Sequence, residues 1–254
     1  MKWLQLFNKS NSIILEFDHL TQNDLESFEE QITEVQKYYQ FSHLEEIGSR
    51  VAGGKRQGLA VITFSNPRKS VLLRALPVLI GKKIPFTLFL RADCIGLNRL
   101  PPEEELQFYA QKYPDKFSQQ IIDEKNHEFI YDPEAGELFL RSLRNEVGPL
   151  PIEIIDPTLF MGTWGKLREI PKDLVEWGIN LYVAPSLKKV VENEILFMRH
   201  QLSVSPRVAK TTQEAVWDEG SLRRFDLAAC VTSKTGAVTQ ESHWWDLPYW
   251  RFST

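Results

Sequence analysis

The chain has 254 residues, of which 43% are hydrophobic and 25% are charged, a composition typical of soluble globular proteins. This length is enough for one large domain or two small ones. The formal net charge of −4 at pH 7 provides no positive field that would gather phosphate groups. We therefore expect no nucleic acid among its partners.

Cysteine usage and the absence of long apolar runs predict where the chain resides. Cys94 and Cys230 lie far apart in apolar surroundings, so we expect two buried, reduced thiols. Residues 1–20 contain no apolar run typical of a secretory signal, and no stretch approaches the ~20 apolar residues that span a membrane. These features predict a cytoplasmic protein without membrane insertion.

The first half of the chain predicts a helix followed by a strand–helix–strand unit. Apolar residues recur at helical spacing from Leu25 to Tyr39, and residues 48–58 form a polar, glycine-bearing loop. Leu59–Phe64 is a short apolar run that ends at a turn signal, as a buried strand does. An apolar helix over Val71–Ile80 and a second strand over Pro85–Leu90 complete a βαβ unit, which implies parallel strands.

The pattern changes between residues 97 and 165, where acidic and prolyl residues accumulate and periodicity weakens. We interpret this segment as an insertion that decorates a single domain spanning residues 1–254. The βα pattern resumes over Leu174–Val183, a helix is predicted over Val190–Leu202, and a further strand over Phe225–Val231. The tail is rich in aromatic residues.

Three blocks, in order, resemble the polysaccharide deacetylase family, also called the NodB-homology or carbohydrate esterase 4-like family. In the first block, Thr63-Phe64, Ala75-Leu76-Pro77, Ile84-Pro85, Phe89 and Ile95-Gly96 fit the family's pattern. The second lies between Phe28 and Glu46, and the third is Phe225–Phe252, where Gly236, Val238, Thr239, Leu247 and Pro248 fit. Together the blocks cover roughly 40% of the chain.

This resemblance implies an α/β fold, a distorted and incomplete (β/α)7 barrel with its site at the carboxyl ends of the strands. It also implies deacetylation of an N-acetyl sugar. In that reaction a divalent metal polarises the amide carbonyl and activates water, a carboxylate accepts the water's proton, and an acid protonates the amine.

The chain departs from the family at the positions that carry this chemistry. The family's T-F-D-D-G motif supplies the base and one metal ligand, whereas this chain has Ser65 and Asn66 there. A serine hydroxyl accepts no proton at neutral pH, and a neutral amide is a poor ligand for a zinc-type metal. The segment that aligns with the family's metal-binding H-x-x-x-H, residues 177–185, contains no histidine. We therefore expect no cofactor, with a divalent metal only if another site has been built.

Three residues are candidates for such a rebuilt site. Asp93 follows the second core strand, and the fold should direct it toward the barrel mouth, although capping or pairing with Arg91 explains it equally well. Asp18 follows an apolar run and would reach the same region. His127 lies among acidic residues of the inserted segment, where a solvated loop is the alternative interpretation.

Aromatic residues are candidates for carbohydrate binding, because their faces pack against the apolar faces of sugar rings. Trp164 stands in a glycine-containing stretch, Phe160 to Leu167, that would otherwise be a loop closing the barrel. His243 lies among the C-terminal aromatics Trp244, Trp245, Tyr249 and Trp250, which would otherwise close the bottom or flank of the barrel.

Three functions remain open from the sequence. The first is a catalytically impaired relative that binds or acts on a cell-surface saccharide or its precursor. The second is an active sugar N-deacetylase with a rebuilt site, and the third is a non-catalytic scaffold or interaction protein. Fold alone does not separate them, because function resides in the site.

Overall fold

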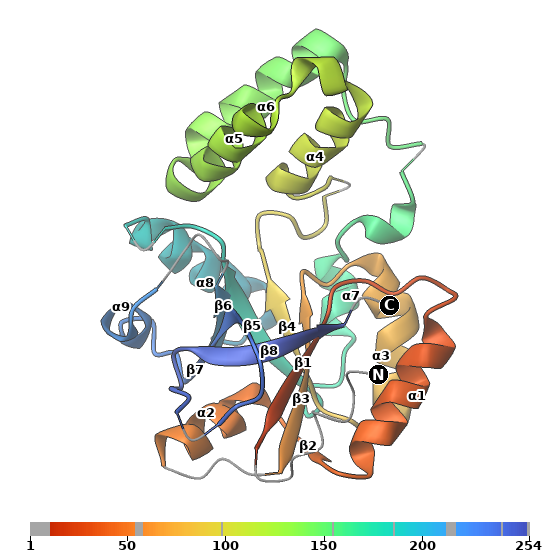
Figure 1. The fold of residues 1–254 in the computed structure, drawn as a ribbon, viewed down its shortest axis with the longest axis vertical. Coiled ribbons are helices and arrows are strands. Elements are labelled where there is room, and N and C mark those ends of the chain that lie inside the picture. The colour runs from red at the N-terminus through yellow and green to blue at the C-terminus, as the bar shows by residue number, and fades with distance from the viewer. Residues whose placement is uncertain are drawn as a thin grey trace.

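The computed structural model describes residues 11–53, 58–97, 99–153, 155–184, 186–211, 217–239 and 241–252. Within these residues, seven parallel strands close into a barrel (Figure 1). Its strands are β1 (Ile13–Phe17), β3 (Leu59–Ser65), β4 (Phe86–Leu90), β5 (Val175–Leu181), β6 (Val208–Thr211), β7 (Ala229–Thr235) and β8 (Leu247–Phe252).

The barrel closes where β1 pairs with β3 on one side and with the last strand, β8, on the other. Around the ring the order is β1, β8, β7, β6, β5, β4 and β3, and β3 returns to β1 with Ile13 opposite Ala60 and Phe17 opposite Phe64. The short strand β2 (Gln40–Phe41) pairs with the first residues of β3, outside the ring. The register shifts between β7 and β8, which distorts that side. The (β/α)7 barrel predicted from the sequence is confirmed.

Buried side chains explain why these segments form strands. Every residue of β1, β3 and β4 is buried, as expected for parallel strands that face the barrel interior on one side and helices on the other. Gly178 in β5 lies between Phe89 of β4 and Val208 of β6, and a Cβ there would come within 2.5 Å of the Phe89 ring. Glycine at this position therefore lets the neighbouring ring fill the interior.

Helices pack around the barrel and above it (Figure 1). The α-helices are α1 (Leu25–Gln36), α2 (Leu44–Ala52), α3 (Leu76–Gly81), α4 (Pro102–Lys112), α5 (Gln119–Tyr131), α6 (Pro133–Val147), α7 (Trp164–Arg168), α8 (Lys188–Leu202) and α9 (Glu219–Arg223). Shorter turns are the π-helix η2 (Val71–Ala75) and the 3-10 helices η3 (Pro114–Lys116) and η4 (Pro157–Leu159).

Several elements differ from those predicted. The helix expected over Val71–Ile80 begins with the π-helical turn η2, which widens the helix just before Pro77, a residue with no N–H to donate. Gly48, predicted to begin a loop, lies buried within α2 against Ala228, and residues 54–57 of that predicted loop lie outside the described residues. The strand predicted over Phe225–Val231 begins only at Ala229.

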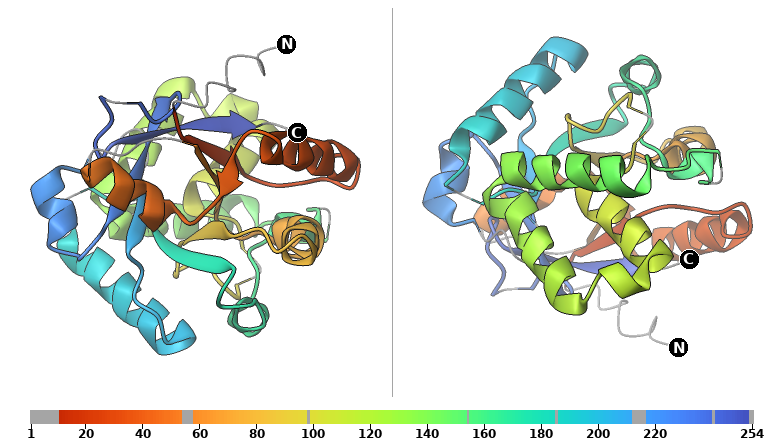
Figure 2. Two further views of the ribbon diagram at one scale, coloured as in Figure 1. Left: turned by 90° about the horizontal axis from the view of Figure 1, so that it is seen from below. Right: turned by 90° about the horizontal axis from the view of Figure 1, so that it is seen from above.

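Helices α4, α5 and α6, which we call the cap, lie beyond the carboxyl end of β4 (Figures 1 and 2). They come from the segment between residues 97 and 165 and contain an apolar cluster of their own, which includes Leu106, Phe129 and Leu140. The cap contacts the barrel where the Ala184 N–H donates to the Ile130 carbonyl at 2.9 Å. Seen from above, the cap covers the barrel mouth (Figure 2).

Two further observations concern the cysteines and the helices. Cys94 and Cys230 are buried free thiols, as predicted. Among the described helices, none is long and apolar enough to cross a membrane. The cytoplasmic location stays a prediction.

Candidate functional site

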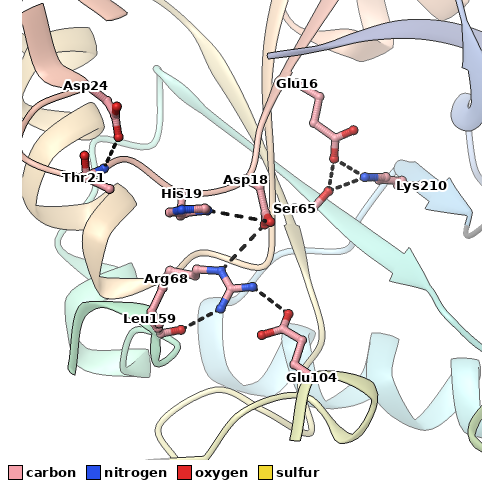
Figure 3. A network of polar contacts seen from close by, with 10 residues as sticks. All are labelled: Glu16, Asp18, His19, Thr21, Asp24, Ser65, Arg68, Glu104, Leu159 and Lys210. Carbon is pink, nitrogen blue, oxygen red and sulfur yellow. Dashed lines mark hydrogen bonds and ion pairs between the residues drawn. The ribbon is translucent and has the colours of Figure 1, made fainter. Parts of the chain in front are cut away.

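A buried group of three polar residues lies inside the barrel mouth: Glu16 of β1, Ser65 of β3 and Lys210 of β6 (Figure 3). We call it the Glu16 group. The Ser65 hydroxyl donates to Glu16 Oε1, and Lys210 Nζ forms an ion pair with the same oxygen. Lys210 Nζ also donates to Ser65 Oγ at 2.6 Å. The three residues, from strands far apart in the sequence, therefore form one closed network.

The Glu16 group is almost completely shielded from water. The Glu16 side chain is 1% exposed and that of Lys210 10%, so each charge depends on the other for compensation. Burial lowers the pKa of Lys210, while the adjacent carboxylate opposes that shift. The Tyr249 ring lies 5.1 Å from Lys210 Nζ, and burial together with Glu16 raises the pKa of Tyr249 to about 12.

Asn66, the residue after β3, faces β5. Its backbone is in the left-handed region, with φ of 57°, which asparagine tolerates better than most residues, and its N–H donates to the Phe89 carbonyl at 2.9 Å. The side-chain amide of Asn180 donates to Asn66 Oδ1 at 3.3 Å. Asn180 Oδ1 and Glu16 Oε2 are buried without a hydrogen-bond partner among the described residues.

Arg68 connects the barrel mouth to the cap (Figure 3). Its guanidinium lies 2.6 Å from Glu104 of α4 and 3.7 Å from Asp18, and it donates to the Leu159 carbonyl at 2.8 Å. The Arg68 side chain is 6% exposed. Asp18 Oδ1 therefore has the buried Arg68 guanidinium as a partner. His19 Nδ1 lies 4.0 Å from Asp18 Oδ2.

Arg91, the residue after β4, forms a second bridge to the cap. Its Nη1 donates to both oxygens of Glu103 at 2.7 and 2.8 Å, and its Nη2 donates to Asp93 at 3.2 Å. The guanidinium packs over the Tyr182 ring at 3.7 Å. The Tyr182 hydroxyl donates to Glu194 of α8 at 3.3 Å, and burial, reinforced by Asp93, raises the pKa of Glu194 to about 8.

A cavity of about 280 Å³, here called the cap cavity, lies between these strand ends and the cap. It is lined by Arg91, Glu103, Glu104, Gln107, Asn126, Phe129, Ile130 and Tyr182. Its volume is just below the range of about 300–1,000 Å³ typical of small-molecule pockets. The cavity therefore has room for one small ring with polar substituents.

The structure brings together only some of the residues predicted from the sequence. Ser65 and Asn66 lie at the barrel mouth as expected. Asp93 and Asp18 lie near that end of the barrel, but each pairs with an arginine, and this pairing satisfies the carboxylate that catalysis would need free. For Asp93, the partner is Arg91, which is the structural alternative that the sequence analysis left open.

The remaining candidates lie elsewhere. Trp164 begins α7 and packs edge-on against Phe197 of α8, with ring centroids 5.5 Å apart. His243 stacks on Trp245 and precedes β8, near the amino end of β7, so it lies at the opposite end of the strands from Ser65. His127 stacks on Tyr131 at the exposed surface of α5.

The residues at the barrel mouth do not fit the metal that the family resemblance implies. The ligands at hand are neutral amides at Asn66 and Asn180, and the Glu16 carboxylate is paired with an ammonium. A fixed positive charge repels a second cation. Among the described residues, no group of three or more His, Cys, Asp or Glu side chains could hold a metal ion.

The Glu16 group was missed because β6 is only four residues long and contains a lysine. A signal was nevertheless present. Glu16 interrupts the apolar run from Ile13 to Phe17, and Lys210 stands in another short β-type segment. Charged residues are rarely buried without a partner, so two such residues in core strands indicate an ion pair.

Comparison with known proteins supports the fold. No protein-family model matches the chain, and no curated protein matches it by sequence. Among solved structures, it is similar to IcaB from Ammonifex degensii, with a TM-score of 0.62 and 13% identity over 96% of this chain and 92% of that one.

Two further structures are named as deacetylases. The Streptococcus pyogenes deacetylase PplD in complex with acetate has a TM-score of 0.57 and 10% identity, with 95% of this chain and 91% of that one covered. The BpsB deacetylase domain from Bordetella bronchiseptica has a TM-score of 0.57 and 13% identity, with 95% of each chain covered. At such identities the comparisons show the fold, which is the deacetylase barrel that the sequence resembles.

Proposed function

We propose that this protein is a divergent polysaccharide deacetylase relative that binds a saccharide at its barrel mouth and does not carry out metal-assisted deacetylation. One observation carries the proposal. The position of the family's base is Ser65, and its hydroxyl is already bonded to an ion-paired Lys210 ammonium and to Glu16. The retained barrel and the cap cavity support a binding role, with a cell-surface saccharide or its precursor as the ligand.

Loss of the reaction follows from the chemistry of these side chains. Metal-assisted hydrolysis needs a cation that lowers the pKa of a bound water and a free carboxylate that accepts its proton. Glu16 is the carboxylate nearest to Ser65, but the Lys210 ammonium holds it as an ion pair. A water molecule near Ser65 would therefore meet neither a metal nor a free base.

The test combines metal content, activity and binding on the full-length protein. We expect elemental analysis to find no stoichiometric divalent metal, and acetate release from N-acetylglucosamine oligomers to stay at the buffer rate with or without added zinc. Calorimetric titration should nevertheless detect binding of glucosamine-based oligomers. Stoichiometric metal together with acetate release would overturn the proposal, and so would the absence of binding to any saccharide.

A second candidate, amide hydrolysis without a metal, is favoured by the contact between Ser65 Oγ and Lys210 Nζ at 2.6 Å. Serine–lysine pairs act as nucleophile and base in some hydrolases. Here the ammonium is paired with Glu16, and Ser65 is only 5% exposed, so we rank this function second. Acetate release that Ser65→Ala abolishes and a chelator leaves unchanged would establish it in place of the first.

A further inference from the structure

The cap shares little apolar contact with the barrel. Among the described residues, Ile130 is the one side chain of α4, α5 or α6 in the apolar cluster of the barrel. Phe108 of α4 also packs against a small cluster in the connecting segments, and the cap helices otherwise pack on one another. Separation of the cap from the barrel would therefore expose little apolar surface, so its hydrophobic cost is low.

Two ion pairs fasten the first turn of α4 to the strand ends. Arg68 Nη2 lies 2.6 Å from Glu104 Oε1. Arg91 Nη1 donates to both oxygens of Glu103, at 2.7 and 2.8 Å. The two arginines are buried, whereas the side chains of Glu103 and Glu104 are 42% and 32% exposed, so water can compete for the carboxylates. Because the two glutamates are adjacent in the sequence, one displacement of α4 breaks both pairs.

Glycines with left-handed backbone stand at both ends of the cap. Gly96, before α4, has φ of 78°, and Gly148, after α6, has φ of 91°; glycine adopts such values without strain and rotates more freely than other residues. The Gly96 N–H donates to the Gly162 carbonyl of the barrel side at 2.9 Å. The Gly148 carbonyl accepts from the Tyr109 hydroxyl of α4 at 3.0 Å. Each glycine thus lies where the chain passes between the two parts, as hinge residues do.

With the cap in this position, the barrel mouth has no room for a saccharide chain. Ser65 is 5% exposed, and the cap covers this end of the barrel (Figure 2). The cap cavity has a volume of about 280 Å³, just below the range typical of small-molecule pockets. A sugar oligomer is larger than one ring, so the cap must move before an oligomer can reach Ser65.

We propose that the cap is a lid that swings as a unit about the connections at Gly96 and Gly148 and so opens the barrel mouth. Its latch is the two ion pairs of Glu103 and Glu104, and this structure is the closed state. The role of opening in saccharide access rests on the proposed function, whereas the motion itself does not depend on it.

The latch can be weakened without leaving a buried charge unpaired. Each latch arginine has a second carboxylate nearby, Asp18 at 3.7 Å for one and Asp93 at 3.2 Å for the other. Loss of the charges of Glu103 and Glu104 therefore leaves both guanidinium groups with a partner. The double variant Glu103→Gln/Glu104→Gln should stay folded and have a more open lid.

Residue-resolved amide hydrogen exchange of the full-length protein measures the motion. The Ala184 N–H donates to the Ile130 carbonyl of α5 at 2.9 Å, a bond that opening breaks. We expect this N–H to exchange about tenfold faster in the double variant, as for the loss of a charge-assisted hydrogen bond. Amides within α6 and β4 should exchange as before. Glu124→Gln/Glu134→Gln, which changes exposed glutamates of α5 and α6, is the control of equal charge and should leave Ala184 unaltered.

Calorimetric titration with a glucosamine-based oligomer measures the effect on access. If only the open state binds the oligomer, the apparent affinity rises in proportion to the fraction of open molecules. We therefore expect the double variant to bind more tightly than the natural protein, by the same factor by which its Ala184 exchange is accelerated.

The outcomes separate the lid from the function that it serves. Unchanged Ala184 exchange in the double variant would overturn the latch, and equal acceleration within α6 would show that the cap unfolds instead of swinging. Faster Ala184 exchange with unchanged affinity would overturn the role in access, while saccharide binding would stand. No binding by either protein would overturn the proposed function and the access role, and the exchange data would still decide the motion. If β4 exchange shows the double variant to be unfolded, Glu103→Gln alone gives the same test with a smaller expected acceleration.

Discussion

The buried ion pair between Glu16 and Lys210 determines what the barrel mouth can do. Two charges taken out of water lose hydration energy that their mutual attraction only partly restores. The pair is therefore a poor source of net stability, but removal of one partner leaves an uncompensated buried charge. This asymmetry makes each residue hard to replace alone.

Replacement of Lys210 by methionine tests this dependence. We expect Lys210→Met to lower the free energy of unfolding by about 3–5 kcal/mol, since Glu16 would stay buried without a cation. Glu16→Leu combined with Lys210→Met should recover most of the loss. Urea unfolding at pH 7 measures both, with Lys189→Met, an exposed lysine of α8, as control. Equal stabilities of the natural protein and Lys210→Met would contradict the ion pair.

The raised pKa of Glu194 predicts that the free energy of unfolding depends on pH. Burial raises its pKa to about 8 in the folded protein, above the value of about 4.3 expected in the unfolded chain. Its protonated form is thus favoured by folding. The stability that the protonated Glu194 side chain contributes is fully present below pH ~4.3 and is lost as the pH rises through about 8.

The change of Glu194 to glutamine isolates this contribution, because the amide oxygen can still accept from the Tyr182 hydroxyl. Between pH 5 and pH 8 we expect the stability of the natural protein to fall relative to Glu194→Gln by up to about 1.4 kcal/mol per pH unit. Denaturant unfolding at several pH values measures the difference. Parallel stability curves would show that Glu194 is ionised in the folded state.

At the scale of elements, the cap is a unit held together by its own core and by one buried carboxylate. Glu105 of α4 is 2% exposed and accepts from Arg144 of α6 at 2.7 and 2.8 Å. The apolar cluster of the cap is separate from that of the barrel. The cap can therefore lose structure while the barrel stays folded.

Replacement of Arg144 by leucine should loosen the cap selectively. Glu105 would become a buried, unpaired charge, so we expect faster amide hydrogen exchange across residues 102–147 and unchanged exchange in β3 and β4. Arg141→Leu is the matched control, since Arg141 is an exposed arginine of the same helix. Uniformly faster exchange in cap and barrel would show that the two unfold together.

The elements differ in how well the sequence predicts them, for physical reasons. Buried apolar runs identify β3 and β4 almost to the residue, because both faces of those strands are covered. The sequence predicts residues 97–165 only as an insertion, since the helices α4 and α5 have weak amphipathic patterns and prolines begin α4, η3 and α6. The cap cavity and the pairing of Arg91 with Glu103 depend on those helices and could not be predicted without them.

At the scale of the whole molecule, the barrel fold and the site chemistry are separable. The fold is shared with structures at 10–13% identity, because a barrel requires only that strands pair and that the interior is filled. The motif positions Ser65 and Asn66 retain the turn after β3 without the carboxylates. Sequence resemblance therefore predicted the scaffold, whereas the buried ion pair that occupies the mouth depends on tertiary contacts between distant strands.

The tight packing of the barrel interior around Gly178 predicts the effect of adding a side chain there. A Cβ there would lie 2.5 Å from Phe89 Cδ1 and 3.1 Å from Val208, in the centre of three adjacent strands. We expect Gly178→Ala to lower the free energy of unfolding by about 1–3 kcal/mol, the usual cost of overpacking. Gly81→Ala in α3, with no atom within 4 Å of the added carbon, should be neutral or slightly stabilising.

Thermal or urea unfolding of both variants measures the effect, and Phe89→Leu in the Gly178→Ala background tests its cause. If the clash with the ring is responsible, the double variant should be more stable than the sum of the two single changes predicts, because residues in contact are not additive. Simple additivity would mean that the alanine destabilises the strand for another reason. The ring of Phe89 would then not be what requires glycine at position 178.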